Sequence, residues 1–297
     1  MQLIVDIKNR FQNGDVLTRL ILVNIAVFLL INFGKLIAWF GLFDGQWMDV
    51  IVHKLSFAEY LPVLITQPWS IITYMFTHES LSHIFWNLIV LYWVGQLILE
   101  YMGEKKLWAI YFLGGLCAII FMWVSLYILQ FAGTISGRNQ FLITPHAYAL
   151  GASGSINACL VAIATLIPNY TLYLFLIGPV RLKYVALVVI LLSAISIPNG
   201  NAGGEIAHLG GALFGYLYTK QLQQGRDVGA WFNKLSRWRL KPKSKMKLAH
   251  KSKEPKSNMH YDEKTIDAIL DKISQSGYSS LSQTEKDILF NASDKKK

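Results

Sequence analysis

The chain has 297 residues, of which 53% are hydrophobic and only 15% are charged. Together with a mean hydropathy of +0.37, this composition excludes an ordinary soluble globular domain of this length. The formal net charge of +10 is concentrated near the termini and in short loops. It therefore indicates a membrane surface, and not nucleic acid, as the anionic partner.

Six apolar runs approach the length of about twenty residues that is needed to cross the hydrocarbon core of a bilayer. In chain order they are residues 20–40, 81–101, 107–129, 151–167, 184–197 and 204–218. The last three are short and carry glycine and serine, so we expect them in the interior of the bundle, away from lipid. The predicted fold class is an all-α polytopic membrane protein with six transmembrane helices.

Basic residues in the short loops predict the orientation of these spans. Lys105 and Lys106 follow the second span, Arg181 and Lys183 follow the fourth, and Lys220 follows the sixth. Because loops rich in lysine and arginine stay in the cytoplasm, both termini are predicted to be cytoplasmic. Spans two, four and six then all begin at the outer face. We find no eukaryotic targeting sequence, which favours a bacterial plasma (inner) membrane.

Two longer connections lie on the predicted outer side. Residues 41–80 mix aromatic and aliphatic side chains with charges, which is typical of a segment that lies in the membrane interface. Residues 130–150 are more polar, and we expect them to cover the site as a mobile cap.

A serine and a histidine stand at the outer ends of two of these spans. Ser153 opens the fourth span and His208 lies near the start of the sixth. Either residue alone is typical of helix packing, but at equal depth they suggest a nucleophile and its base. Small residues after each of them let the two helices approach closely. These small residues are Gly154, Ala158, Ala162, Gly211 and Gly215.

The second span adds candidate oxyanion donors. His83 and Asn87 are spaced i, i+4 and therefore share one helical face. Both are costly in a membrane unless they face a wet cavity. They are suited to hold the negative oxygen of a tetrahedral intermediate, together with the backbone N–H of Ser153 at a helix N-terminus. His78 is expected to order a neighbouring loop, with a plain interfacial position as the alternative.

The three motifs resemble those of the rhomboid family of intramembrane serine proteases. The motifs are His83-Ile84-Phe85-Trp86-Asn87, Gly151-Ala152-Ser153-Gly154 and Ala207-His208-Leu209-Gly210-Gly211. The resemblance covers about residues 15–220. It implies a six-helix rhomboid bundle, a Ser153–His208 dyad, and oxyanion contacts from His83, Asn87 and the Ser153 backbone, with Gly151, Gly154 and Gly211 in supporting positions.

One position departs from the family pattern. In the family an aromatic residue four positions after the serine commonly stacks on the histidine, whereas this chain has Asn157 there. The Asn157 amide could hydrogen-bond His208 instead, or the local packing could differ. No metal site is expected, because no His-Glu-x-x-His motif occurs and the histidines lack a carboxylate or thiolate at ligand spacing.

Composition divides the chain into three parts. We expect a cytoplasmic N-terminal segment (1–19), a membrane domain (20–222) and a basic cytoplasmic tail (223–297). In the tail, Trp231, Leu235 and Trp238 share one face of a predicted juxtamembrane helix, and residues 241–256 are expected to be disordered.

The end of the tail is predicted to form a short helical hairpin. An apolar stripe at residues 266–273 is followed by Gly277, which can end a helix, and by a capping box from Ser282 to Glu285. We expect the hairpin to bind either a partner that the sequence does not identify or the loops of the membrane domain, with a marginally folded tail that has no separate task as the alternative.

Residues and resemblance together predict an integral-membrane serine endopeptidase without metal or cofactor. It is expected to cleave transmembrane protein substrates near the outer membrane face, with membrane lipids and not nucleic acid as its other partners. The alternative is a catalytically inactive rhomboid-like protein that binds membrane helices, but such a protein is expected to lack the serine or the histidine. A small-molecule transporter is a second alternative, which predicts discontinuous helices around a midplane ion site.

Overall fold

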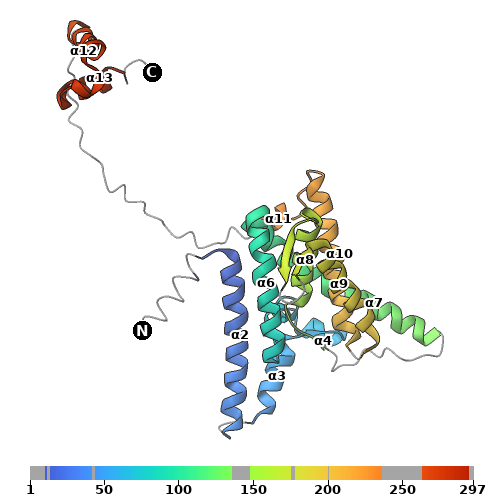
Figure 1. Ribbon diagram of the computed structural model, residues 1–297. Coiled ribbons are helices and arrows are strands. Elements are labelled where there is room, and N and C mark those ends of the chain that lie inside the picture. The colour runs from blue at the N-terminus through green and yellow to red at the C-terminus, as the bar shows by residue number, and fades with distance from the viewer. Residues whose placement is uncertain are drawn as a thin grey trace. The chain divides into compact units, whose positions relative to one another are not determined.

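The computed structural model describes Phe11 and residues 14–41, 44–135, 148–174, 178–199, 201–235 and 263–293. Within the chain, Met1–Pro242 and Lys243–Lys297 form two separate compact units. The first unit is a bundle of helices, and the second contains a pair of short helices (Figure 1).

Six helices of the first unit correspond to the six predicted spans (Figure 1). They are α2 (Val16–Trp39), α6 (Leu81–Tyr101), α7 (Glu104–Ile135), α8 (Ser153–Leu166), α9 (Leu182–Ser196) and α10 (Ala202–Gln223). By length and composition, α2, α6 and α7 are long and apolar enough to cross a membrane, and α8 and α9 are shorter apolar helices. The structure therefore has the predicted fold class, an all-α, polytopic membrane bundle.

Side-chain caps fix where three of these helices begin. The side chain of Asp15 accepts from the Thr18 N–H at the start of α2, at 2.7 Å. Ser80 caps α6 through the backbone N–H of His83. At the start of α10, which follows the short helix η2 (Ile197–Asn199), Asn201 accepts from the Gly204 N–H. One of the caps, Ser80, thus binds the backbone of the candidate residue His83.

The central helix of the bundle is α8. Every residue from Gly154 to Ala164 is buried, and α8 contacts α6, α7, α9 and α10. At 1.5 Å per residue, its 14 residues extend about 21 Å, less than the roughly 30 Å of a hydrocarbon core. The prediction that this short span lies inside the bundle is confirmed.

Helix α9, in contrast, does not lie inside the bundle. Its buried residues are Leu182, Ala186 and Ser193, whereas Leu187, Val188, Leu191, Leu192 and Ile195 are exposed. The expectation of an interior helix is wrong for α9, because it contains no glycine and only a narrow stripe of small residues for packing. Its broad aliphatic face points away from the bundle.

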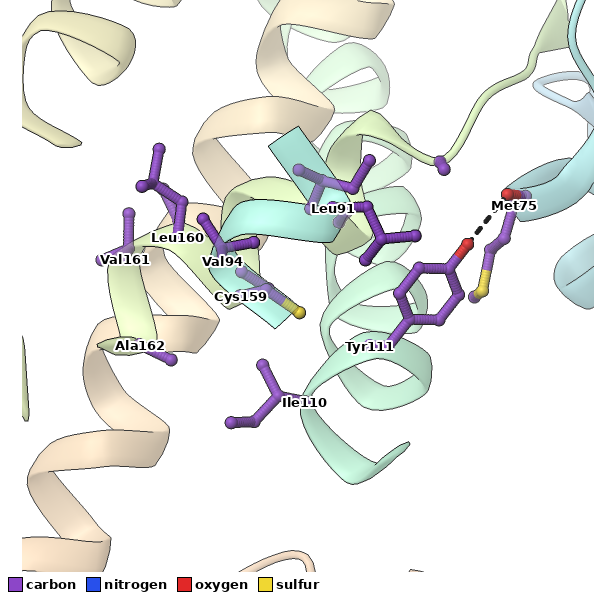
Figure 2. Close-up of a cluster of buried hydrophobic side chains, with 14 of the residues drawn as sticks. Met75, Leu91, Val94, Ile110, Tyr111, Cys159, Leu160, Val161 and Ala162 are labelled. Carbon is purple, nitrogen blue, oxygen red and sulfur yellow. Dashed lines mark hydrogen bonds between the residues drawn. The ribbon is translucent and has the colours of Figure 1, made fainter. Parts of the chain in front are cut away.

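The core lies where α6, α7 and α8 meet (Figure 2). Apolar side chains from the three helices pack together there, among them Leu91, Val94, Ile110, Cys159 and Leu160. The buried Tyr111 hydroxyl donates to the Met75 carbonyl oxygen at 3.2 Å. The side-chain amide of Asn24 donates to the same hydroxyl at 3.4 Å, so polar contacts tie α2 and α7 to the segment before α6.

The connection between α2 and α6 is a series of short elements. They are α3 (Gln46–Leu55), β1 (Phe57–Ala58), α4 (Leu61–Thr66), α5 (Ser70–Thr73) and η1 (Tyr74–Phe76). The strand β1 pairs antiparallel with β2 (Tyr148–Ala149), just before the serine motif. A second pair, β3 (Thr171–Leu174) and β4 (Gly178–Arg181), joins α8 to α9. Neither pair of strands was predicted. Most of the predicted cap, residues 136–147, lies outside the described residues.

Residues after α10 pack against α7. Asp227 forms an ion pair with Lys106 and accepts from the Tyr218 hydroxyl at 3.3 Å. The helix α11 (Ala230–Leu235) contacts α7, with the Phe232 ring centroid 6.0 Å from that of Phe112. The predicted domain break after residue 222 therefore falls within the first compact unit, because these contacts continue beyond α10.

The second unit contains the predicted helical hairpin. It consists of α12 (Glu263–Ser276), η4 (Tyr278–Ser280) and α13 (Gln283–Ser293). Gly277 follows α12 with φ +76°, and Ser282 and Glu285 form the predicted reciprocal capping box. Ile269 and Leu281 are buried. The predicted helical face through Trp238 and the predicted disordered stretch 241–256 lie outside the described residues.

Candidate active site

Ser153 is the first residue of α8, and the turn before it requires glycine. Gly151 has φ +115°, in the region of backbone space that side chains disfavour. A Cβ atom at Gly151 would lie 2.7 Å from the Cε1 atom of His83. The Gly151 N–H donates to the Tyr74 carbonyl oxygen at 2.9 Å. This glycine therefore lets the chain turn into α8 with Ser153 close to His83.

Ser153 and His208 lie within hydrogen-bonding distance of each other. The Ser153 Oγ atom is 2.7 Å from Nε2 of His208. The two helices approach closely because Gly211 lies against the carbonyl oxygen of Gly154, and Gly215 lies against that of Ala158. The predicted close packing of small residues is confirmed. The distance suits transfer of the serine proton to the imidazole.

The other ring nitrogen of His208 has two partners that sequence reasoning missed. Glu205 Oε2 is 3.1 Å from His208 Nδ1, and Ser193 Oγ is 3.2 Å from the same atom. Glu205 lies three residues before His208 on α10, so the i, i+3 spacing was a readable signal. Ser193 belongs to α9, and no local pattern links it to His208.

Asn157 is buried on α8, one turn after Ser153. Among the described residues, the hydrogen-bonding partners of His208 are Ser153, Ser193 and Glu205. The structure thus shows no hydrogen bond from Asn157 to His208. Asn157 instead lines a cavity beside Ser153.

His78 connects the predicted oxyanion side chain to the residue before the nucleophile. Its Nε2 atom accepts from the Asn87 amide at 3.2 Å and from the Ala152 N–H at 3.4 Å. With Nε2 as the acceptor, Nδ1 carries the proton and faces the Phe76 carbonyl oxygen at 3.4 Å. Burial, together with the nearby His83, lowers the pKa of His78 to about 4. The ring is therefore neutral at neutral pH, as both accepted hydrogen bonds require.

A cavity of about 330 Å³ lies beside Ser153, between α6, α8 and α9. It combines polar groups with an apolar wall. The polar lining is Ser82, His83, Asn87, Ser153 and Asn157, and the apolar lining is Trp86, Val90, Ile156, Leu160 and Val189. The predicted nucleophile and oxyanion side chains thus share one cavity. In the part of the chain that the structure describes, no group of three or more histidine, cysteine or acidic side chains is arranged to hold a metal ion.

Fold and site together define a polytopic helical membrane protein with a serine–histidine pair in its bundle. The Rhomboid domain family matches residues 66–224, more than half of the chain. The chain therefore belongs to the rhomboid family. A second family, DUF6576, whose function is unknown, matches residues 252–295 and so covers the hairpin of the second unit.

Three curated relatives each match about half of this chain. RHOMBOID-like protein 12, mitochondrial, of Arabidopsis thaliana is 31% identical over 159 residues, 53% of this chain and 47% of the relative. Presenilin-associated rhomboid-like protein A, mitochondrial, of Danio rerio is 33% identical over 48% of this chain and 34% of its own length. A Bos taurus presenilin-associated rhomboid-like protein is 27% identical over 48% of this chain and 35% of its own.

The chain thus spans about half the length, or less, of the curated relatives that it matches. All three relatives are named as mitochondrial, so they give no support to the bacterial membrane that the sequence favoured. Family membership and the apolar helices do establish an integral membrane protein.

Proposed function

We propose that this chain is an intramembrane serine endopeptidase that uses Ser153 as nucleophile and His208 as base. The observation that carries the proposal is the 2.7 Å distance between Ser153 Oγ and His208 Nε2, beside a cavity that His83 and Asn87 also line. A non-catalytic helix-binding protein has no need of this alignment.

The reaction follows from the placement of these groups. Ser153 Oγ attacks the scissile carbonyl carbon while its proton passes to Nε2 of His208. The backbone N–H of Ser153 lies in the first turn of α8, where it has no partner within the helix, and it can donate to the oxyanion with His83. Asn87 uses one amide N–H for His78, which leaves its second N–H for the same oxygen.

The reaction is then completed in two steps: the tetrahedral intermediate breaks down to an ester, and the ester is hydrolysed. His208 returns the proton to the leaving amine, the carbon–nitrogen bond breaks, and an ester to Ser153 remains. Water then attacks this ester while its proton passes to His208. The bond between the carbonyl carbon and Ser153 Oγ breaks, His208 returns the proton to Oγ, and the acid is released. The Trp86, Val90 and Leu160 side of the cavity can take an apolar side chain of the substrate while its backbone faces Ser153.

Transmembrane proteins are the proposed substrates, and lipids the surrounding partners. A substrate helix has to unwind locally to present an extended bond, so small or helix-breaking residues near the cut are expected. Charge in the loops supports a topology with both termini in the cytoplasm and the site toward the outer face. Cysteine labelling of single-cysteine variants from each side of the membrane tests this topology.

The test compares variants of the purified protein in lipid bilayers with a transmembrane substrate. Ser153→Ala is expected to abolish cleavage and labelling by a fluorophosphonate, and His208→Ala is expected to reduce both to a small residual rate. Ser155→Ala is the matched control, because the Ser155 hydroxyl is buried on the same helix without a hydrogen-bonding partner among the described residues. If Ser153→Ala cleaves as fast as the wild type, the assignment of Ser153 as nucleophile is wrong. If the wild type is neither active nor labelled, the non-catalytic alternative replaces the proposal.

A further inference from the structure

We infer that Glu205 is a positioning residue for His208, so that the site works as a Ser153–His208–Glu205 triad. The inference rests on the proposed function, because it assigns a part in that reaction. The inference is based on the contacts of the two nitrogen atoms of the His208 ring. Ser153 Oγ is 2.7 Å from Nε2, and Glu205 Oε2 is 3.1 Å from Nδ1.

The two contacts fix where the imidazole proton lies. Ser153 can give its proton to Nε2 only if Nε2 is unprotonated, so the proton of the neutral ring has to be on Nδ1. A carboxylate can only accept a hydrogen bond, and Glu205 therefore stabilises this tautomer. When His208 takes up the serine proton, the same carboxylate faces the new positive charge.

The surroundings of Glu205 favour this role. Its side chain and that of His208 are 20% and 23% exposed, so water screens their interaction only in part. Glu205 lies in the first turn of α10, where the helix dipole stabilises a negative charge. Ser193 Oγ, 3.2 Å from Nδ1, offers a second acceptor from α9. The ring is thus held from two helices.

A purely structural role for Glu205 predicts a different outcome. As a charge at the start of α10, it would stabilise the helix without regard to the tautomer of His208. Glu205→Gln keeps the shape of the side chain but can offer an N–H to Nδ1, and so also tolerates the unproductive tautomer. Asn201→Ala is the matched control, because it removes the cap of the same helix without touching the ring.

The experiment measures kcat, KM, melting temperature and the rate of Ser153 labelling by a fluorophosphonate for the full chain in bilayers. Glu205→Gln is expected to lower kcat and the labelling rate roughly 100-fold, with KM and melting temperature close to wild type. Asn201→Ala is expected to lower the melting temperature and leave kcat within about threefold. In a His208→Ala background, Glu205→Gln is expected to have no further effect on residual turnover.

The possible results separate this inference from the proposed function. If the wild type cleaves and is labelled, but Glu205→Gln matches it in kcat and labelling rate, the triad is wrong and the dyad stands. If Glu205→Gln lowers residual turnover in the His208→Ala background by the same factor as in the wild type, its role is structural and the inference is overturned. A wild type that neither cleaves nor is labelled refutes the proposed function, and the triad with it.

Discussion

His78 holds two parts of the candidate site through a single nitrogen atom. Its Nε2 accepts from the Asn87 amide and from the Ala152 N–H, and its ring lies 5.0 Å from that of His83 between centroids. A protonated ring would have no acceptor on Nε2. The alignment of Asn87 with Ser153 therefore depends on a neutral His78.

This dependence predicts a loss of stability in mild acid. The pKa of His78 is lowered from 6.5 to about 4 in the folded chain, so between these values the unfolded chain binds more protons. The contribution of His78 is complete above about pH 6.5 and is lost as the pH falls toward 4, by at most about 3 kcal/mol. Melting temperatures measured from pH 7.5 to 4 are expected to fall more steeply for wild type than for His78→Gln. Equal slopes would contradict the assigned pKa.

Much of the candidate site could be predicted because its residues stand in local motifs. Ser153, His208, His83 and Asn87 each lie at a recognisable helical position. The structure brings Ser153, His83 and Asn87 to one cavity and places His208 within hydrogen-bonding distance of Ser153. Ser193 could not be found, since its approach to His208 depends on how α9 packs against α10.

At the scale of whole helices, the packing of α8 against α10 sets the distance between Ser153 and His208. Gly211 is one turn after His208 and meets the carbonyl oxygen of Gly154, the residue after Ser153. The Thr219 hydroxyl donates to the Ala162 carbonyl oxygen at 3.1 Å farther along the same interface. Backbone atoms are in contact here, so the interface has little room to adjust.

A methyl group at Gly211 is therefore expected to separate the two helices. Gly211→Ala should lower the free energy of unfolding by about 1–3 kcal/mol. It should also reduce fluorophosphonate labelling of Ser153 by roughly 100-fold, because the hydroxyl and imidazole lose their alignment. Gly45→Ala is the control, since among the described residues a Cβ there meets only Ala38, at 4.0 Å. Labelling at the wild-type rate in Gly211→Ala would show that the spacing is not critical.

At the level of elements, the length of the apolar runs predicted where helices form. It was a poorer guide to whether a helix is buried in the bundle or faces outward. All six spans correspond to helices, since runs of this composition have to satisfy their backbone groups internally. The lipid-facing position of α9 was missed because its length resembles that of the buried α8. The pairing of β1 with β2 joins residues 57–58 to 148–149. Local sequence patterns do not predict a contact between segments that are so far apart in the sequence.

At the scale of the whole molecule, the chain combines a membrane unit with a separate short hairpin. The two have different stabilising contacts: the membrane unit is built on buried apolar helices, whereas the hairpin buries few side chains, including Ile269 and Leu281. In the hairpin, Lys272 contacts both carboxylate oxygens of Glu285, at 2.8 and 3.0 Å. This ion pair joins α12 to the capping box of α13.

The hairpin is expected to loosen without the membrane unit when Glu285 loses its charge. The hydrogen bond from Lys272, with those of Ser282, lowers the pKa of Glu285 to about 2. Its stabilising contribution is thus complete above about pH 4.5 and is lost as the pH falls toward 2. Glu285→Gln removes it at neutral pH. Hydrogen exchange of the full chain at pH 7 should then be faster in α12 and α13 only, and faster exchange in α8 as well would contradict this independence.

The enclosure of α8 has a consequence for how the bilayer affects the site. No residue of α8 from Gly154 to Ala164 is exposed, whereas α6, α9 and α10 present large apolar side chains outward, such as Trp86, Leu191 and Leu213. A thinner or thicker bilayer tilts helices that it touches. We therefore expect it to move Asn87, on α6, relative to Ser153, so that lipid chain length changes the rate of the proposed reaction.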